Sequence, residues 1–260
     1  MKTNFLLILC CIFLFVGCTN TIQKNHVSSD EFGVQWYSGF TLSENLKNPI
    51  TLEAQSSIRG ILKEQWNREY KVIIENNSET TVTIATCSDY FNYQNNIINT
   101  LPENDYNNFR SVAIMCHAAE LIANAKPALL SNFIYPLTGE KILKQFPPHV
   151  AYIASESFRQ ELLTDPSITS FLDVINATEN TVTSINRENR NQFLFETQQN
   201  EIIHISLIAR GDFSGNGTEE ILVLSKQHLE MPFGYSMETL YILKPDKVSE
   251  LFMFVDEIYL

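Results

Sequence analysis

The residues of this chain whose types and spacing could do chemistry are its cysteines and one run of oxygen-bearing side chains set between glycines. A cysteine thiolate can be alkylated or oxidised to a disulfide, whereas carboxylate, hydroxyl and amide oxygens are ligands for hard cations such as Ca²⁺. The oxygen-bearing run is GDFSGNGTEE, residues 211–220. The cysteines are at positions 10, 11, 18, 87 and 116. What each group can do depends on the segments that position it.

The first 17 residues are typical of an export signal. Lys2 supplies a positive charge, residues 5–16 form an almost unbroken apolar run, and Gly17 is a small residue at the expected cleavage point. The apolar run is shorter than the ~20 residues that a membrane-spanning helix needs. An ordinary secretory signal cut nearby, or an uncleaved anchor helix, is the alternative. We expect a signal peptide over residues 1–17 and export of the remainder.

The tetrad Phe15-Val16-Gly17-Cys18 resembles the lipobox of bacterial lipoproteins, with Phe15 at a position where Leu is usual. The resemblance implies that Cys18 becomes the mature N-terminus and carries lipid, diacylglycerol and palmitate, as a membrane anchor. Acyl chains anchor stably in pairs because each buried CH₂ contributes ~0.8 kcal/mol. Thr19 after the cysteine, rather than Asp, implies the outer membrane, facing the periplasm, if the cell has two membranes.

Only Cys87 and Cys116 remain in the exported body. Two cysteines in an oxidising compartment favour a single disulfide. It would close a loop of 29 positions (116 − 87), and on the chain-entropy model such a loop contributes roughly 3.5 kcal/mol. A pair of buried free thiols is the alternative, because cysteine packs as a small hydrophobe.

The run at 211–220 resembles the Asp-x-Asp-x-Asp-Gly loops of calcium-binding repeats, especially the FG-GAP type, in which the loop leads into a strand. The resemblance implies oxygen ligands from alternate positions and from a later carboxylate. These positions are Asp212, Ser214, Asn216 and Glu220, with the Thr218 carbonyl as a further ligand. The alternative is a metal-free turn, since Asn-Gly is a strong turn signal and an Asp can close an Asx-turn. In either case the loop is structural.

The charge balance excludes one class of partner. The chain has 18 Lys+Arg and 30 Asp+Glu; loss of residues 1–17 removes only Lys2, leaving 17 − 30 = −13. Nucleic-acid binding needs a basic footprint that this body lacks. An envelope protein with a basic surface is the partner that such a charge favours.

The hydrophobic pattern predicts an α+β fold. Residues 18–32 are polar without a repeating apolar pattern, as expected of a flexible tether. Residues 33–175 form a mixed α/β region with the disulfide candidate. Residues 176–260 are β-rich runs joined by connections too short for crossovers, which predicts an antiparallel meander.

Several elements can be placed within these regions. The clearest helix follows a possible capping box at Thr100–Glu103 and is stopped by Pro127, so the disulfide would join it to Cys87 at the end of the preceding strand. Two further helices are expected at 50–65 and 156–163. Strands are expected at 34–37, 70–75, 80–86, 150–154, 182–185, 193–197, 202–209, 220–225, 239–243 and 251–255.

The histidines give no recognisable active site. His117 and Glu120 lie at i and i+3 on one helix and could ligate a metal, but a hydrogen-bonding His is favoured. His204 could be imagined with Asp212 and Ser214 as a hydrolase trio, although the loop's glycines already explain those two residues as a turn. The remaining candidates, His149 and His228, are interpreted as ordinary surface or packing residues.

The chain as a whole is similar to an uncharacterised class of bacterial envelope proteins that combine a Cys-bearing helical N-terminal part with a C-terminal Asp-x-x-Gly-x-Gly β-region. That resemblance brings no activity with it. No Walker loop, GxGxxG or GxSxG motif is present. We expect a non-catalytic lipoprotein that binds another envelope component. A periplasmic hydrolase with a site assembled from distant residues is the alternative.

Overall fold

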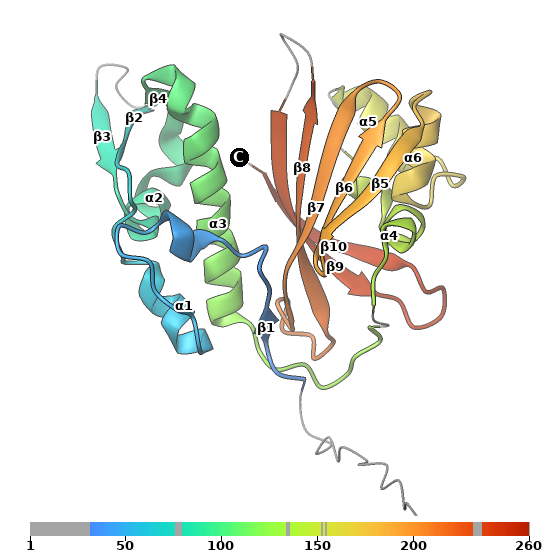
Figure 1. Ribbon diagram of the computed structural model, residues 1–260, viewed down its shortest axis with the longest axis horizontal. Helices are drawn as coiled ribbons and strands as arrows, with labels where there is room; N and C mark the ends of the chain where they lie inside the picture. Colours follow the sequence, from blue (N-terminus) through green and yellow to red (C-terminus); the bar gives the residue numbers. More distant parts are fainter. Residues whose placement is uncertain are drawn as a thin grey trace, which may run out of the picture. The chain divides into compact units, whose positions relative to one another are not determined.

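A computed structural model of the chain describes residues 32–75, 80–133, 136–151, 153, 155–230 and 236–259. The expected signal peptide, Cys18 and nearly all of the tether lie outside the described residues. The fold is α+β, as predicted (Figure 1). Within the described ranges, no helix is both long and apolar enough to cross a membrane.

The C-terminal region is the predicted antiparallel meander. Its strands are hydrogen-bonded in the order β10-β9-β8-β7-β6-β5, each antiparallel to its neighbour. A seventh strand, β1 (Gln35–Trp36), comes from the N-terminal region and pairs with β7 beyond the part that pairs with β6. The meander strands are β5 (Val182–Asn189), β6 (Gln192–Thr197), β7 (Glu201–Gly211), β8 (Glu220–Leu229), β9 (Ser236–Pro245) and β10 (Phe252–Tyr259).

The central strands of this sheet are buried on both faces. Side chains alternate across a strand, so in β8 Leu222 and Leu224 join one core while Ile221 and Val223 join another. The first core faces helix α3 (Tyr106–Asn124). The second is covered by the helices α4 (Gly139–Gln145), α5 (Glu156–Thr164) and α6 (Phe171–Ala177).

The N-terminal region forms a layer on the α3 side of the sheet. It contains a three-stranded sheet in the order β3-β2-β4 and two short helices. The strands are β2 (Tyr70–Ile74), β3 (Thr81–Ile84) and β4 (Ile97–Leu101); the helices are α1 (Gln55–Ile61) and α2 (Cys87–Tyr93). Single 3₁₀ turns are η1 (Leu42–Asn45), η2 (Gln94–Asn96), η3 (Glu103–Asp105) and η4 (Pro148–Val150).

Three local predictions were wrong. Thr100 is not a helix cap: it is buried in β4 opposite Val72, and η3 separates it from α3. The segment predicted as a strand at 150–154 begins instead in the turn η4, which two prolines initiate. The helix predicted at 50–65 is shorter in the structure, where only α1 (Gln55–Ile61) is helical.

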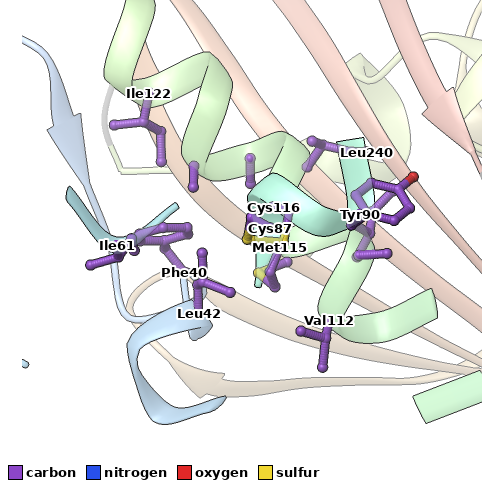
Figure 2. Close-up of a cluster of buried hydrophobic side chains, with 14 of the residues drawn as sticks. Phe40, Leu42, Ile61, Cys87, Tyr90, Val112, Met115, Cys116, Ile122 and Leu240 are labelled. Carbon is purple, nitrogen blue, oxygen red and sulfur yellow. A yellow bond between two sulfur atoms is a disulfide. The ribbon is translucent and has the colours of Figure 1, made fainter. Parts of the chain in front are cut away.

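Helix α3 contributes ten buried residues to the first core. It is 19 residues long, and buried residues occur in every one of its turns. This burial follows from its position, because it contacts α1, α2 and β4 as well as β7, β9 and β10 of the large sheet. Figure 2 shows Val112, Met115 and Ile122 of α3 among side chains from η1, α1, α2 and β9.

The predicted disulfide joins α2 to the middle of α3. Cys87 and Cys116 are bonded, with their Cα atoms 5.4 Å apart, and both are fully buried (Figure 2). The sequence predicted Cys87 at the end of a strand, but the residue is the first of helix α2. The reason is Thr86, whose hydroxyl accepts a hydrogen bond from Asp89 N at 3.0 Å and so caps a helix there.

His117 follows the disulfide cysteine and has a packing role. Its Nε2 lies 3.0 Å from the Tyr90 hydroxyl, and its ring contacts the rings of Tyr90 and Phe91 edge-on. Burial lowers the pKa of His117 to about 4. Glu120, its predicted partner in metal binding, is exposed. His117 is therefore the hydrogen-bonding histidine that the sequence favoured.

Removal of the disulfide tests its contribution to stability. The double variant Cys87→Ala/Cys116→Ala should lose about 3.5 kcal/mol of unfolding free energy, because the unfolded chain regains the freedom of a 29-residue loop. Urea denaturation of oxidised protein, reduced protein and the variant measures it. If reduced wild type and variant both unfold with the oxidised protein's midpoint, the bond does not stabilise this fold.

Burial of His117 makes stability depend on pH. Its folded pKa is about 4 and its unfolded pKa about 6.5, so the unfolded state binds the proton first as pH falls. The stabilisation is complete above pH ~6.5 and is lost towards pH ~4, with a slope of up to about 1.4 kcal/mol per pH unit. His117→Gln, which retains a hydrogen-bonding group for Tyr90, should flatten the wild-type curve in that window. Identical curves for the two proteins would contradict the assignment.

Candidate functional site

The sheet face that packs on α3 changes from apolar to polar halfway along three strands. Alternate residues share a face, so the series continues from Ile208 to Ser206 and His204 in β7 and from Leu224 to Lys226 and His228 in β8. In β9 it continues from Leu240 to Glu238 and Ser236. We call these six polar residues the polar end of the sheet.

Strand register brings the polar end together. His204 pairs with Lys226, which also pairs with Glu238 on the next strand. His228 lies opposite Ser236, one pleat further along. Residues separated by 34 positions in sequence, such as His204 and Glu238, therefore share one row of side chains across the sheet.

A cleft of about 640 Å³ lies over the polar end of the sheet. Its other wall is the first half of α3, from Asn108 to Met115, together with Glu44 and Asn45 of η1. Its volume falls within the roughly 300–1,000 Å³ typical of ligand pockets. Val112 and Met115 of α3 and Leu224 of β8 also line the cleft, next to the polar side chains.

One hydrogen-bonded group ties the two walls together. Glu238 Oε1 accepts from Lys226 Nζ at 3.0 Å and from Ser111 Oγ of α3 at 2.6 Å. The other carboxylate oxygen, Oε2, is buried and accepts no hydrogen bond from the described residues. Glu238 thus fixes the position of α3 over the sheet and keeps one acceptor unused.

The two histidines of the polar end are stacked. The rings of His204 and His228 are nearly parallel, with planes at 13° and centroids 6.1 Å apart. His204 Nδ1 also lies 3.9 Å from Glu188 Oε1. Burial lowers the pKa of His204; Glu188 acts against this shift, and His228 and Lys226 reinforce it. His204 is therefore neutral at neutral pH and retains a ring nitrogen that can accept a hydrogen bond.

The charges of the cleft favour a cationic ligand. Three carboxylates line it, those of Glu44, Glu188 and Glu238, against one ammonium group, that of Lys226. The ammonium is already paired with Glu238. A neutral imidazole and the free carboxylate oxygens leave acceptors in excess of donors.

His228, interpreted from the sequence as an ordinary surface or packing residue, is stacked on His204 because the β7–β8 register places the two side by side. Asp212 and Ser214 do not complete a trio with His204: their side chains bond within their own loop. The sequence did contain a signal for the polar end of the sheet. Pairs of polar residues at i and i+2 continue an apolar alternation at 204/206, 226/228 and 236/238.

The loop predicted as a calcium site joins β7 to β8, at the other end of these strands. Asp212 Oδ1 accepts from Asn216 N, and its Oδ2 from Gly217 N, both at 2.9 Å. Glu220 Oε2 accepts from the backbone N–H groups of Phe213 and Ser214, both at 2.9 Å. Gly215 and Gly217 have positive φ values of 74° and 79°, which suit glycine at these turns.

The remaining proposed ligands bond to one another. Glu220 Oε1 accepts from the Ser214 hydroxyl and from Asn216 Nδ2, and Asn216 Oδ1 accepts from Thr218 N at 2.8 Å. In the parts of the chain that are described, no three His, Cys, Asp or Glu residues are grouped to hold a metal. Calcium would have to share oxygens that already accept hydrogen bonds. The loop is complete as a turn, and calcium stays a prediction.

Substitution of Asp212 tests both its role in closing the turn and its predicted role as a calcium ligand. Asp212→Ala leaves two loop N–H groups without acceptors and should cost about 2–6 kcal/mol of unfolding free energy, since each lost partner costs about 1–3 kcal/mol. Because the turn closes without a metal, the wild-type melting midpoint should be the same in millimolar calcium and in chelator. A calcium-dependent rise in wild type that Asp212→Ala lacks would show that the metal belongs there.

Comparison with protein-family models, with curated proteins and with solved structures finds no match to this chain. The geometry of the cleft and the chemistry of its lining are therefore the basis for a functional proposal.

Proposed function

We propose that this protein is a lipoprotein of the bacterial cell envelope that binds a cationic segment of another envelope protein in the cleft between α3 and the large sheet. The lipid on Cys18 holds it to the membrane, at the outer membrane and facing the periplasm. The observation that carries the proposal is the lining of the cleft, in which three carboxylates face one ammonium group.

Two features support an extracytoplasmic location. The N-terminal residues have the pattern of a lipoprotein signal. The Cys87–Cys116 disulfide is of a kind that persists in oxidising compartments such as the periplasm. The net charge of about −13 on the mature chain agrees with a basic protein partner and with the absence of nucleic acid among its ligands.

The hydrogen bonds of the cleft favour binding over catalysis. Among the described residues, neither His204 nor His228 hydrogen-bonds to a hydroxyl or thiol, so no nucleophile is paired with a base. Glu238, Lys226 and Ser111 are occupied in holding the walls of the cleft. A hydrolase is the second candidate because His204 lies near Glu188, a carboxylate that could orient it as a general base.

The proposal can be tested with lipid-free protein and short lysine-rich peptides of mixed sequence. Glu44→Gln/Glu188→Gln should weaken peptide binding by up to about thirtyfold, because exposed ion pairs contribute roughly 0.2–1 kcal/mol each. Calorimetric titration at two salt concentrations measures it, and binding should weaken as salt rises.

Glu140→Gln is the matched control, since Glu140 is an exposed carboxylate of α4 on the other side of the sheet. Equal weakening by Glu140→Gln, or preference for acidic peptides, would contradict the cleft as the binding site. Cleavage of the peptides, lost in His204→Gln, would favour the hydrolase.

A further inference from the structure

An exposed apolar corner lies where the described chain begins. Leu129 and Leu130, in the segment after α3, are each 65% exposed, and Phe32 is 42% exposed. Phe32 N donates to Ala128 O at 2.7 Å, and Ala128 N donates to Phe32 O at 2.9 Å. The two leucines are therefore next to the first described residue. We call Phe32, Leu129 and Leu130 the apolar corner.

The corner is held firmly by backbone hydrogen bonds. Leu129 N and Leu130 N both donate to Gly217 O, at 2.9 and 3.0 Å, and Glu219 N donates to Leu130 O at 2.7 Å. Lys126 and Asp212 exchange two further backbone bonds. The segment is clamped between Phe32 on one side and the 212–220 loop on the other. Both leucines lie on this fixed backbone and are largely exposed.

The charges around the corner do not oppose a lipid surface. Lys126 is exposed, whereas the carboxylates of Asp212, Glu219 and Glu220 are buried. Those of Asp212 and Glu220 accept hydrogen bonds from the loop, and that of Glu219 accepts from Ser131 and lies 3.4 Å from Arg210. Of the described acidic residues near the corner, these three thus point inward; Asp30 and Glu31, which precede Phe32, lie outside the described residues.

The corner is also within reach of the anchor. Cys18 and Phe32 are 14 positions apart (32 − 18), so whatever path the chain takes, they are separated by no more than about 50 Å. A lipid on Cys18 keeps this end of the body close to the bilayer.

We propose that the apolar corner docks on the membrane surface, with Leu129 and Leu130 inserted among the lipid headgroups. This inference rests on the lipid anchoring in the proposed function and adds an orientation to it. Leu129 follows the C-terminal end of α3, whereas the cleft lies beside its N-terminal half. Docking at this corner directs the cleft away from the bilayer, towards a partner in the periplasm.

The test uses an artificial anchor, so that its result does not depend on lipidation of Cys18. Residues 19–260 contain both hydrophobic cores; they are fused to an N-terminal hexahistidine tag and held on phosphatidylcholine vesicles containing a nickel-chelating lipid. Leu129→Trp reports on the corner, and brominated acyl chains quench a tryptophan that enters the bilayer. Ile98→Trp is the matched control, because Ile98 is 53% exposed in β4, near the opposite end of α3.

On vesicles, the tryptophan fluorescence of the Leu129→Trp variant should shift to shorter wavelength. The brominated lipids should quench it several-fold more than the fluorescence of the Ile98→Trp variant. Adding Leu130→Asp should abolish the difference. Equal quenching at the two positions, with the protein sedimenting with the vesicles, would overturn the proposal. So would a Leu129→Trp shift that grows with protein concentration without vesicles, since a second copy would then cover the corner. Labelling of Cys18 by palmitate in cells tests the anchor separately.

Discussion

Burial of the middle of helix α3 between two layers is the constraint on which the rest of this structure depends. A helix with one apolar stripe could rest on the large sheet and leave its other face to water. The middle of α3 has buried residues all round, so it needs a second layer, which β2–β4, α1 and α2 supply. The disulfide fixes that layer to α3, and Glu238 fixes α3 to the sheet through Ser111.

The same arrangement gives the contact between α3 and the sheet an apolar end and a polar end. At the C-terminal end of α3, the strands beneath it present Ile208, Leu222 and Ile242, and the contact is apolar. At its N-terminal end the same strands present polar side chains, and the layers separate into the cleft. The helix has 19 residues and is therefore about 28 Å long. A body docked by its apolar corner would have the cleft beside the half of α3 that is further from the membrane.

In the structure, the 212–220 loop supports the backbone of the apolar corner. Its carboxylates were singled out as metal ligands, yet the structure uses them to close a turn whose backbone supports Leu129 and Leu130. Burying Asp212 and Glu220 requires donors for their oxygens, and the loop's own N–H groups provide them. A turn built in this way can position its neighbours without a bound ion.

Local pattern predicted the meander strands and the α+β class because both depend on short-range alternation and turn residues. The disulfide was predictable because the expected signal peptide and lipidated Cys18 account for the other three cysteines, and Cys87 and Cys116 are then a single pair. The pairing of β1 with β7 was not, since two residues carry no periodic signal and the partner lies more than 170 positions away. The cleft was missed for a related reason. His204, Lys226 and Glu238 become neighbours only through strand register, and register is fixed by the whole sheet and its turns.

The central claim is that the cleft holds an envelope partner presented to it by membrane anchoring. Photo-crosslinking in the native envelope from a probe at Ser206, which lines the cleft, tests it most directly, with a probe at Glu140 on the far face as reference. The account predicts one dominant crosslinked protein with a basic surface, formed from position 206 but not 140, and lost with Cys18→Ala. Equal crosslinking from both positions, or crosslinking unaffected by Cys18→Ala, would contradict it.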